Sequence, residues 1–378
     1  MTHALAALAG KRILITGHTG FKGAWLSQWV LDAGAKVCGV GLPARTGPCL
    51  YRQLDLSSHI EEHEVDLRDT EALKKVVSNF QPELVFHLAA QALARPAFTN
   101  PVETFSVNVQ GTVNLLEALR EVAIPCGAVM VTSDRCYENY EWNVGYREED
   151  ALGGADPYSA SKAAAEIAIS AYRRSYFDPE KIIVNDLGTP QVGIASARSG
   201  NVIGGGDWAP DRLIPEAVKA LTRGAVIPVR NPRSVRPWQH VLEPLAGYIV
   251  LAVALQEAVQ ERKYDLRGLA SPFNFGPNLG ASQSARVLID EFLKYWPGTW
   301  EDRTDPKGPP EVGQLLLNSE KAGRLLAWGP KWGFKEAVEK TAEWYRSSLA
   351  APLRARDLVR ADIAAYLQAP TLPIKPAT

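Results

Sequence analysis

A glycine-rich turn between an apolar run and a helical segment is the feature that most constrains this chain. Residues 11–16 (KRILIT) are typical of a buried parallel strand, and Gly17, Gly20 and Gly23 follow at a spacing of three. Glycines at such a turn let the backbone approach a pyrophosphate, and the N-terminus of the next helix offers unpaired N–H groups to the anion. This order of strand, turn and helix predicts the start of a dinucleotide-binding fold, with further contacts from Thr19, Phe21 and Lys22.

Short β-branched runs alternate with helical patterns through the N-terminal half of the chain. Such alternation is typical of βαβ units and predicts an α/β fold of the Rossmann type, with a doubly wound parallel sheet. Strands are expected at 11–16, 36–40, 83–87, 127–132 and 191–198, with one more ending at 64–66, and helices at 21–32, 70–80, 102–122 and 156–177.

The pattern becomes less regular in the C-terminal half, where proline, glycine, tryptophan and arginine gather in loops. We expect residues 1–198 to form the dinucleotide-binding domain, with a strand near 273–275 returning to its sheet. Residues 199–350 are expected to form mainly a smaller C-terminal substrate-binding region. Residues 351–378 are interpreted as a partly disordered extension, because 368–378 is rich in proline and poor in large apolar residues.

Composition excludes several classes of protein. The chain has 41 Lys and Arg against 42 Asp and Glu, a formal net charge of −1, so no overall positive field draws in nucleic acid. The longest strongly apolar stretch, Tyr248 to Leu255, is far shorter than the roughly 20 residues of a membrane-spanning helix, and the N-terminus lacks the basic region of a signal peptide. Four cysteines without metal-ligand spacing indicate reduced thiols, no metal site and a cytoplasmic location.

Residues after the third and fourth strands are expected to complete the cofactor side of the site. The carboxyl ends of parallel strands form the edge at which ligands bind. Candidates for the adenine are Asp66 and Leu67, and candidates further along the cofactor are Leu88, Ala89 and Ala90.

One expected feature is absent at the end of the second strand. NAD binding usually places an acidic residue there, about 20 residues after the glycines, for the ribose hydroxyls. The stretch 40–45 (VGLPAR) has no acid, and Arg45 is suited to a 2′-phosphate instead. On these residues the choice between NAD and NADP stays open.

A tyrosine and a lysine four residues apart are the strongest sign of chemistry. Tyr158 and Lys162 would share one helix face, where the lysine ammonium would favour the phenolate of the tyrosine. Tyr158 would then take the proton of a sugar hydroxyl as hydride leaves the same carbon, and Lys162 would also hold the nicotinamide ribose. Thr132, at the end of the fifth strand, would complete the hydrogen bonds around that hydroxyl.

These motifs together resemble one family. The glycine turn, HLAAQ at 87–91, TSD at 132–134 and the Tyr158–Lys162 pair look like the extended short-chain dehydrogenase/reductases. Longer strings are similar to the CDP-glucose 4,6-dehydratases within that family, namely TGHTGFKG at 16–23, CYEN at 136–139, GYRE at 145–148, GNVIGGGDW at 200–208 and RPWQHVLEPLAGY at 236–248.

The resemblance implies an NAD-dependent hydro-lyase that converts CDP-glucose to CDP-4-dehydro-6-deoxyglucose. C4 is oxidised, water is lost across C5 and C6, and hydride returns to C6. The residue matching Asp134 is the acid that protonates the departing hydroxyl, and the next residue is usually a lysine that removes the C5 proton. This chain has Arg135 there, and because a guanidinium is a poor base, Arg135 is expected to stabilise the enolate electrostatically.

Substrate contacts are expected from positively charged, polar and aromatic side chains. A diphosphate needs positively charged donors, which makes Arg198, Arg212 and Arg236 candidates. Further candidates are Gln91, Asn201, which matches a family contact near the diphosphate, Trp208 and Trp238.

Two rival interpretations remain beside the dehydratase. A nucleotide-sugar 4-epimerase or 4-reductase uses the same tyrosine and lysine but needs no acid after Thr-Ser, so Asp134 argues against it. A nucleotide-binding protein without activity is the other. The resemblance also implies a homodimer or homotetramer, formed through the helices at 102–122 and 156–177, and a role in deoxysugar biosynthesis such as that of lipopolysaccharide O-antigen.

Overall fold

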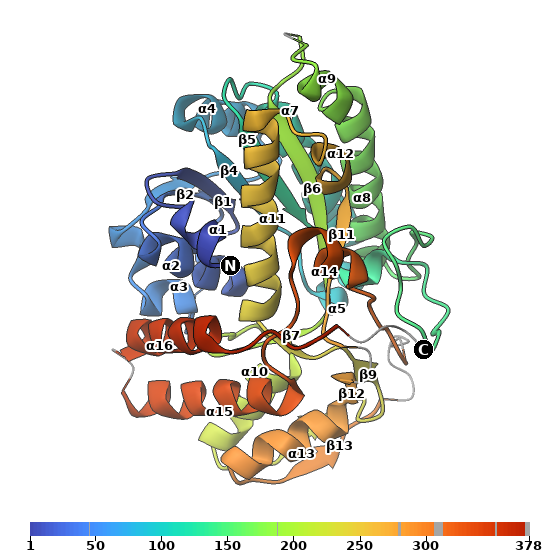
Figure 1. Ribbon diagram of the computed structural model, residues 1–378. Helices are drawn as coiled ribbons and strands as arrows, with labels where there is room; N and C mark the ends of the chain where they lie inside the picture. The colour runs from blue at the N-terminus through green and yellow to red at the C-terminus, as the bar shows by residue number, and fades with distance from the viewer. Residues whose placement is uncertain (45, 187, 279–280, 306–312, 352–353, 375–378) are drawn as a thin grey trace.

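The computed structural model describes residues 1–44, 46–186, 188–278, 281–305, 313–351 and 354–374. Most of them are organised around a seven-stranded sheet of order β11-β6-β5-β4-β1-β2-β3, in which every neighbouring pair is parallel (Figure 1). The strands are β1 (Arg12–Thr16), β2 (Lys36–Gly41), β3 (Glu61–Glu64), β4 (Leu84–His87), β5 (Cys126–Val131), β6 (Val192–Ser199) and β11 (Pro272–Phe275).

This sheet confirms the predicted α/β fold of the Rossmann type. The central strands are buried along almost their whole length, as a sheet covered on both faces requires. The strand expected near 273–275 returns to the sheet, where β11 pairs with β6. The third strand ends at Glu64 rather than at residue 66, because the carbonyl of Asp66 already accepts a turn hydrogen bond from the N–H of Asp69.

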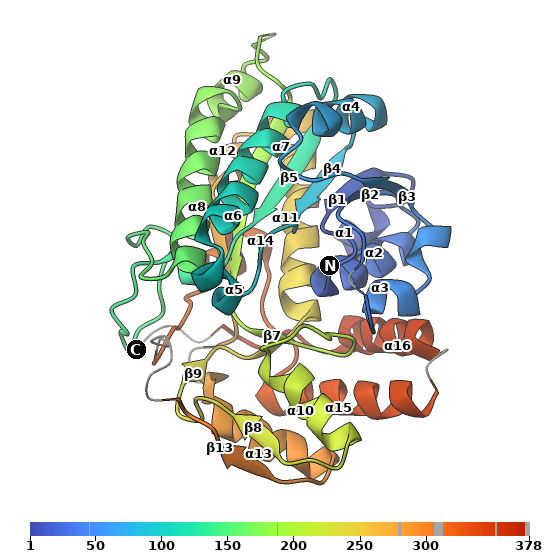
Figure 2. The same cartoon turned by 180° about the vertical axis from the view of Figure 1, so that it is seen from behind.

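Helices cover both faces of the sheet (Figures 1 and 2). One face carries α2 (Phe21–Asp32) and α11 (Leu242–Glu261), and the other carries α4 (Thr70–Phe80), α7 (Gly111–Leu119) and α8 (Pro157–Ser175). Shorter helices connect them, namely α1 (Thr2–Ala6), α3 (Leu50–Gln53), α5 (Ala94–Thr99), α6 (Pro101–Phe105), α9 (Pro179–Ile183), α12 (Leu266–Leu269), α14 (Glu320–Leu326) and the 3₁₀ turns Leu56–Ser58 and Asp134–Cys136.

The helix expected at 102–122 is interrupted in the structure. A π-helical segment, Ser106–Gln110, joins α6 to α7, and the helix ends at Leu119. Within this segment the side chain of Asn108 hydrogen-bonds the backbone of Gln91 and donates to the hydroxyl of Ser161 on α8. The irregular turn therefore ties the loop after β4 to α8.

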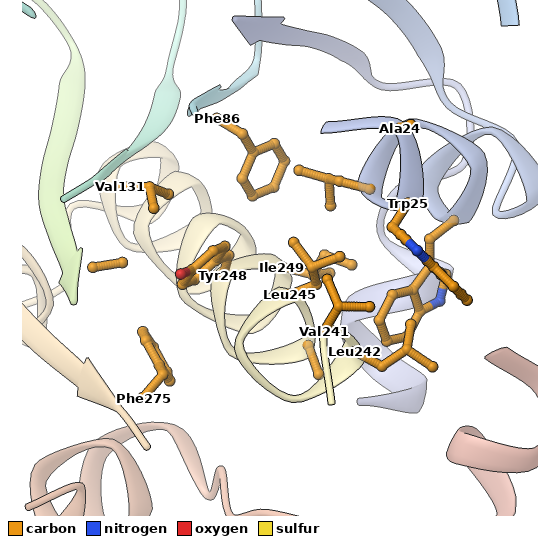
Figure 3. Packing of buried hydrophobic residues seen from close by; sticks show 14 of the residues in the cluster. Ala24, Trp25, Phe86, Val131, Val241, Leu242, Leu245, Tyr248, Ile249 and Phe275 are labelled. Carbon is orange, nitrogen blue, oxygen red and sulfur yellow. The ribbon is translucent and has the colours of Figure 1, made fainter. Parts of the chain in front are cut away.

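α11 is the central helix of the larger core. It packs against β5, β6 and α2, and Figure 3 shows Leu242 of α11 next to Trp25 of α2. By length and composition α11 is able to cross a membrane, with a mean hydropathy of 1.4 over 18 residues, but 83% of that window is buried inside the fold. The helix extends well beyond the apolar stretch 248–255, and its place in the core accounts for its apolar sequence.

A second group of elements lies beyond the carboxyl edge of the sheet, below it in Figure 1. Its helices are α10 (Leu213–Thr222), α13 (Ala285–Tyr295) and α15 (Phe334–Ala350). Its short strands pair two by two, β7 (Val202–Ile203) with β10 (Gln239–His240), β9 (Val235–Arg236) with β12 (Gln283–Ser284), and β8 (Ile227–Val229) with β13 (Trp300–Asp302).

Most of the described C-terminal extension forms a packed helix, which the sequence analysis did not predict. α16 (Ala355–Gln368) buries one apolar face, and the hydroxyl of its Tyr366 donates to the buried Glu243 of α11 at 2.9 Å. The chain after the helix is also attached, since the N–H of Leu372 donates to the carbonyl of Pro330 at 2.8 Å. Disorder is expected from the sequence only for 368–378, and of that range the described residues 368–374 lie against the fold. Residues 375–378 lie outside the described part of the chain.

Candidate active site

A cavity of about 1150 Å³ lies at the carboxyl edge of the sheet. Residues directly following β1, β2, β4, β5 and β6 line it, as expected for the ligand site of a doubly wound sheet. The second group of elements supplies the facing wall, which includes Arg212 and Arg236. This volume exceeds that of an ordinary small-molecule site and leaves room for two ligands.

Most of the residues singled out from the sequence line this one cavity. They are Gly17, Thr19, Gly20, Phe21, Lys22, Gly23, Asp66, Leu67, Leu88, Ala89, Ala90, Thr132, Asp134, Arg135, Tyr158, Lys162, Asn201, Trp208, Arg212, Arg236 and Trp238. Arg45 lies outside the described residues.

The predictions that Arg198 and Gln91 contact substrate are corrected, because neither lines the cavity. Arg198 is 2% exposed, and its guanidinium is held by the carboxylate of Glu166 at 2.9 Å and by the hydroxyl of Tyr137 at 2.8 Å. The side chain of Gln91 accepts from the N–H of Leu93 and donates back to its carbonyl, which keeps it within its own loop. Both side chains hold the fold behind the cavity.

The glycine-rich turn has the geometry of a phosphate cradle. Gly17 has a left-handed backbone (φ +74°), and a Cβ atom on it would lie 2.7 Å from the backbone nitrogen of Ala89. A Cβ on Gly23 would lie 2.1 Å from the carbonyl oxygen of Gly17, so both positions need glycine. α2 begins directly after Gly20 without a side-chain cap, which leaves its first N–H groups for an anion. The turn therefore fits the pyrophosphate of a dinucleotide.

The residues near the expected adenosine end are polar and partly paired. The carboxylate of Asp66 accepts from the guanidinium of Arg68 at 2.5 Å, and this hydrogen bond lowers the pKa of Asp66. Leu42 and Pro43 line the cavity where an acidic residue would contact ribose hydroxyls. The hydroxyl of Thr19 donates to the carbonyl of Leu42 at 3.1 Å. Among these residues, Asp66 is the one carboxylate available to this end of the cavity.

Tyr158 and Lys162 line the cavity from α8. Burial raises the pKa of the Tyr158 phenol, while the hydrogen bond with Ser133 and the positive charges of Arg135 and Arg212 oppose that shift. Burial lowers the pKa of Lys162 to about 8. The main groups that favour the phenolate here are Ser133, Arg135 and Arg212, which the sequence analysis did not name for this role.

Asp134 is a buried carboxyl beside this pair, with 4% of its surface exposed. Burial raises its pKa, and the hydrogen bond from Ser133 and the positive charges of Arg135, Arg236 and Lys22 oppose the shift. Its Oδ1 accepts from Ser133 Oγ at 3.0 Å, whereas Oδ2 has no hydrogen-bond partner among the described residues. A carboxyl whose pKa is raised, with one buried oxygen left without a partner, is suited to act as a general acid.

Arg135 is fixed at the start of α8. Its Nη2 donates to Oδ2 of Asp156 at 2.5 Å, and the same carboxylate caps α8 through Oδ1. The guanidinium lies 5.7 Å from the centre of the Tyr158 ring. A permanent charge held there suits electrostatic stabilisation and does not suit proton abstraction.

Glu166 lies behind the cavity and supports the site through hydrogen bonds, a role that the sequence analysis did not find. Its Oε1 accepts from Thr132 Oγ1 at 2.5 Å, and its Oε2 accepts from Arg198 and from Ser196. Because the proton of the Thr132 hydroxyl points to Glu166, Thr132 can meet a ligand hydroxyl only as an acceptor. Glu166 follows Lys162 by four residues, so the helical spacing contained the signal.

The facing wall carries two further ion pairs. Arg212 pairs with Asp207 at 2.9 Å, and Arg230 pairs with Asp211 at 2.9 Å. The sequence analysis did not find Arg230, nor Asn231 and Ser234, which also line the cavity. These three lie in a loop without a periodic pattern, so no sequence signal pointed to them.

The two candidate tryptophans are held in place through their indole N–H groups. Trp238 donates to the carbonyl of Gln283 at 2.9 Å, and Trp208 donates to the side chain of Gln53 at 3.3 Å. Both side chains also line the cavity, so their rings are available as fixed apolar surfaces for a ligand.

One group of potential metal ligands lies outside this cavity. Cys38, Glu61 and His63 bring their ligand atoms within 4.8 Å of one another on β2 and β3. Burial and the charge of Glu61 raise the pKa of the Cys38 thiol to about 12. Because a thiol must lose its proton to bind a metal, we assign no metal centre there.

A tyrosine and a lysine one helical turn apart, beside a phosphate cradle at the carboxyl edge of a parallel sheet, define a short-chain dehydrogenase/reductase. Residues 14–341 match the family described as GDP-mannose 4,6 dehydratase. The chain belongs to this family, which confirms the resemblance drawn from the motifs.

Individual relatives agree with this assignment. The CDP-glucose 4,6-dehydratase of Salmonella typhimurium is 42% identical over 366 residues, which cover 96% of this chain and 98% of the relative. The dTDP-glucose 4,6-dehydratase 1 of Escherichia coli is 26% identical, covering 89% and 93%.

Solved structures share the fold. That of dTDP-glucose 4,6-dehydratase from Bacillus anthracis in complex with NAD has a TM-score of 0.73 at 22% identity, covering 91% of this chain and 100% of the other. That of UDP-glucose 4-epimerase from Thermus thermophilus in complex with NAD has a TM-score of 0.73 at 25% identity, covering 89% and 99%.

Proposed function

We propose that this protein is a CDP-glucose 4,6-dehydratase, which converts CDP-glucose to CDP-4-dehydro-6-deoxyglucose. The observation that carries the proposal is the buried carboxyl of Asp134, which lines the same cavity as Tyr158 and Lys162. A 4-epimerase or 4-reductase needs only the tyrosine and lysine. Asp134 is an additional acid with a raised pKa, and the loss of water needs such an acid because the C6 hydroxyl leaves readily only when it is protonated. The near-full-length similarity to a CDP-glucose 4,6-dehydratase supports the same reaction.

The cofactor in this proposal is NAD. The glycine turn fits its pyrophosphate, and the remaining parts would be held by Asp66, Leu67, Leu88, Ala89, Ala90, Tyr158 and Lys162, all of which line the cavity. The chemistry that a nicotinamide supplies when bound is acceptance of the C4 hydride and its return to C6. The NAD complex of the Thermus thermophilus epimerase supports this choice over NADP.

The chain's own residues would move protons in three steps. Tyr158 takes the proton of the sugar O4, and the nearby charges of Arg135 and Arg212 help the phenol to release its own proton beforehand. Asp134 then donates its proton to the C6 hydroxyl, which leaves as water. The C5 proton passes to water in the cavity, and Arg135 stabilises the enolate that forms. When hydride reaches C6, water returns a proton to C5, and the proton that Tyr158 took from O4 is released to restore the acid form of Asp134.

The facing wall would hold the nucleotide part of the substrate. Arg212, Arg236 and Arg230 supply positive charge for a diphosphate, and Asn201 lies beside them in the cavity lining. The rings of Trp208 and Trp238 would flank the base or the sugar. On this basis residues 1–198 mainly serve the cofactor and residues 199–350 mainly serve the substrate.

The remaining parts of the proposal concern the cell and the assembly. We place the enzyme in the cytoplasm as a homodimer or homotetramer, with no membrane or nucleic-acid partner. Exposed apolar side chains on the proposed interface helices, Val102 at 83% and Ile167 at 60% exposure, support self-association there. Its product would feed deoxysugar biosynthesis, such as that of lipopolysaccharide O-antigen.

Turnover of a panel of nucleotide-glucoses tests the substrate. CDP-glucose is expected to lose one water, detected by mass spectrometry, at a rate at least about tenfold above UDP-, dTDP- and GDP-glucose, because a base-reading pocket discriminates by at least 1.4 kcal/mol. If another nucleotide-glucose lost water faster than CDP-glucose, the enzyme would not be specific for CDP-glucose. A product of unchanged mass with every substrate would contradict the dehydratase itself.

A further inference from the structure

Lys22 is a lysine in the cavity wall without a carboxylate partner among the described residues. It lies in the first turn of α2, and its Nζ donates to Ser199 Oγ at 2.7 Å and to Tyr248 Oη at 3.4 Å. Those two hydroxyls are 2.8 Å apart. Figure 3 shows Tyr248 on α11 at the end of the apolar cluster nearest β6, with its oxygen turned away from Trp25. An ammonium held by two neutral hydroxyls is an unusual use of a lysine in a core of this kind.

The charges around Lys22 link it to the proposed acid. Burial, together with the charges of Arg212 and Lys162, lowers the pKa of Lys22 to about 7, and the charge of Asp134 opposes this shift. Asp134 in turn is influenced by Lys22, Arg135 and Arg236. Such a coupling acts in both directions, so the protonation of either group changes the proton affinity of the other.

Asp134 and the serine that holds Lys22 lie at the ends of adjoining strands. Ser199, which holds Lys22, is the last residue of β6, and Asp134 follows the neighbouring strand β5. A Cβ atom on Gly200, the residue after Ser199, would lie 2.9 Å from Oδ2 of Asp134, the oxygen that has no hydrogen-bond partner among the described residues. The free oxygen of the acid therefore points to the segment that holds Lys22.

We propose that Lys22 is a positioning residue for the dehydration step, because its ammonium sets how readily Asp134 holds the proton that it gives to the C6 hydroxyl. This inference rests on the proposed function. While Lys22 is charged, it favours the carboxylate of Asp134. When Lys22 loses its proton near pH 7, that stabilisation ends and Asp134 retains its proton to higher pH. A lysine at this position thus keeps the acid usable at a pH where a fixed cation would have ionised it.

Other charged and titratable groups face the pair and must stay unchanged in the test. Arg135 and Arg236 face Asp134, Arg212 and Lys162 face Lys22, and the phenols of Tyr158 and Tyr248 lie nearby. Two substitutions of Lys22 alone isolate its charge. Lys22→Arg makes the charge permanent, and Lys22→Met removes it at similar length and with good helix propensity.

At high pH, kcat for the loss of water falls as Asp134 loses its proton. The alkaline limb of the pH profile of kcat therefore reports the ionisation of Asp134. We expect Lys22→Arg to move this limb to lower pH and Lys22→Met to move it to higher pH, each by roughly one unit, the effect of a single charge a few ångströms away. A role in packing or in cofactor binding alone would reduce the rate of both variants without shifting the limb in opposite directions. Limbs that shift together, or not at all, would overturn the inference.

A second measurement does not depend on activity. In cofactor-loaded protein carrying ¹³C-carboxyl aspartate, the Asp134 signal is assigned as the one missing from Asp134→Asn. Relative to the wild type, the titration midpoint of Asp134 is expected to rise in Lys22→Met and to fall in Lys22→Arg. An unchanged midpoint in both variants would overturn the inference even where catalysis is too slow to measure. If the wild type releases no water from CDP-glucose, the proposed function fails, whereas the NMR result still decides whether Lys22 and Asp134 are coupled.

Discussion

Tyr158→Phe is expected to lower kcat for CDP-glucose by roughly a thousandfold, within the range that general acid–base catalysis supplies, while cofactor binding is retained. The substitution removes only the oxygen that accepts the O4 proton, and the ring that packs against α8 and the cavity stays. The first oxidation cannot proceed without that acceptor, so no reduced cofactor should form on mixing with substrate. The measurement is steady-state turnover together with the dissociation constant of the cofactor.

Tyr172→Phe is the matched control for this variant. Tyr172 lies on the same helix, and its hydroxyl donates to Glu117 at 2.6 Å outside the cavity lining. The same loss of one oxygen there should leave kcat within about twofold, since a hydrogen bond distant from the site changes stability rather than chemistry. Turnover of Tyr158→Phe at the level of Tyr172→Phe would mean that the reacting hydroxyl lies elsewhere.

Asp134→Asn is expected to slow the loss of water by roughly a hundredfold or more, because an amide cannot give its proton to the departing hydroxyl. Oxidation at C4 depends on Tyr158 and should be affected less. Reduced cofactor should therefore accumulate on the enzyme during turnover. Stopped-flow absorbance with each variant measures both steps at once.

Asp178→Asn is the control for this second prediction. Asp178 caps α9, outside the cavity lining, and asparagine is an equally good N-cap, so its effect on turnover should be small. If Asp134→Asn eliminated water at the control rate with no accumulation of reduced cofactor, another group would have to be the acid.

Patterns that act over one turn or one strand predicted the core of this site. The glycines at 17, 20 and 23 are typical of one backbone turn, the phosphate-binding turn between β1 and α2. The structure shows that a Cβ at Gly17 or Gly23 would collide with backbone. The pair Tyr158 and Lys162 depends only on helical spacing, and α8 begins at Pro157 with Asp156 as its N-cap. Local rules were sufficient there because each residue's neighbours in sequence are also its neighbours in space.

Residues whose role depends on distant partners were not predicted correctly. Arg198 and Arg212 carry the same charge. Only the fold shows that Arg198 pairs with Glu166 behind the cavity, whereas Arg212 lines it. The effects of Arg135 and Arg212 on the Tyr158 phenol were not predicted, because both residues lie on other elements. Partners brought together by tertiary packing leave no signal in the spacing of either residue.

The C-terminal extension shows what composition alone misses. Its proline-rich end, 368–378, suggested that 351–378 is partly disordered, and the helix before that end was not predicted. The apolar face of α16 packs on the fold through residues such as Val359 and Ile363.

The transfer of deuterium from C4 to C6 within one substrate molecule tests the account most directly. CDP-glucose deuterated at C4 is incubated with the enzyme in ordinary water, and the product is analysed by NMR and mass spectrometry. We predict CDP-4-dehydro-6-deoxyglucose that carries the label at C6, with no net consumption of cofactor. Label lost to the solvent, label still at C4, or a product of unchanged mass would contradict the proposed dehydratase.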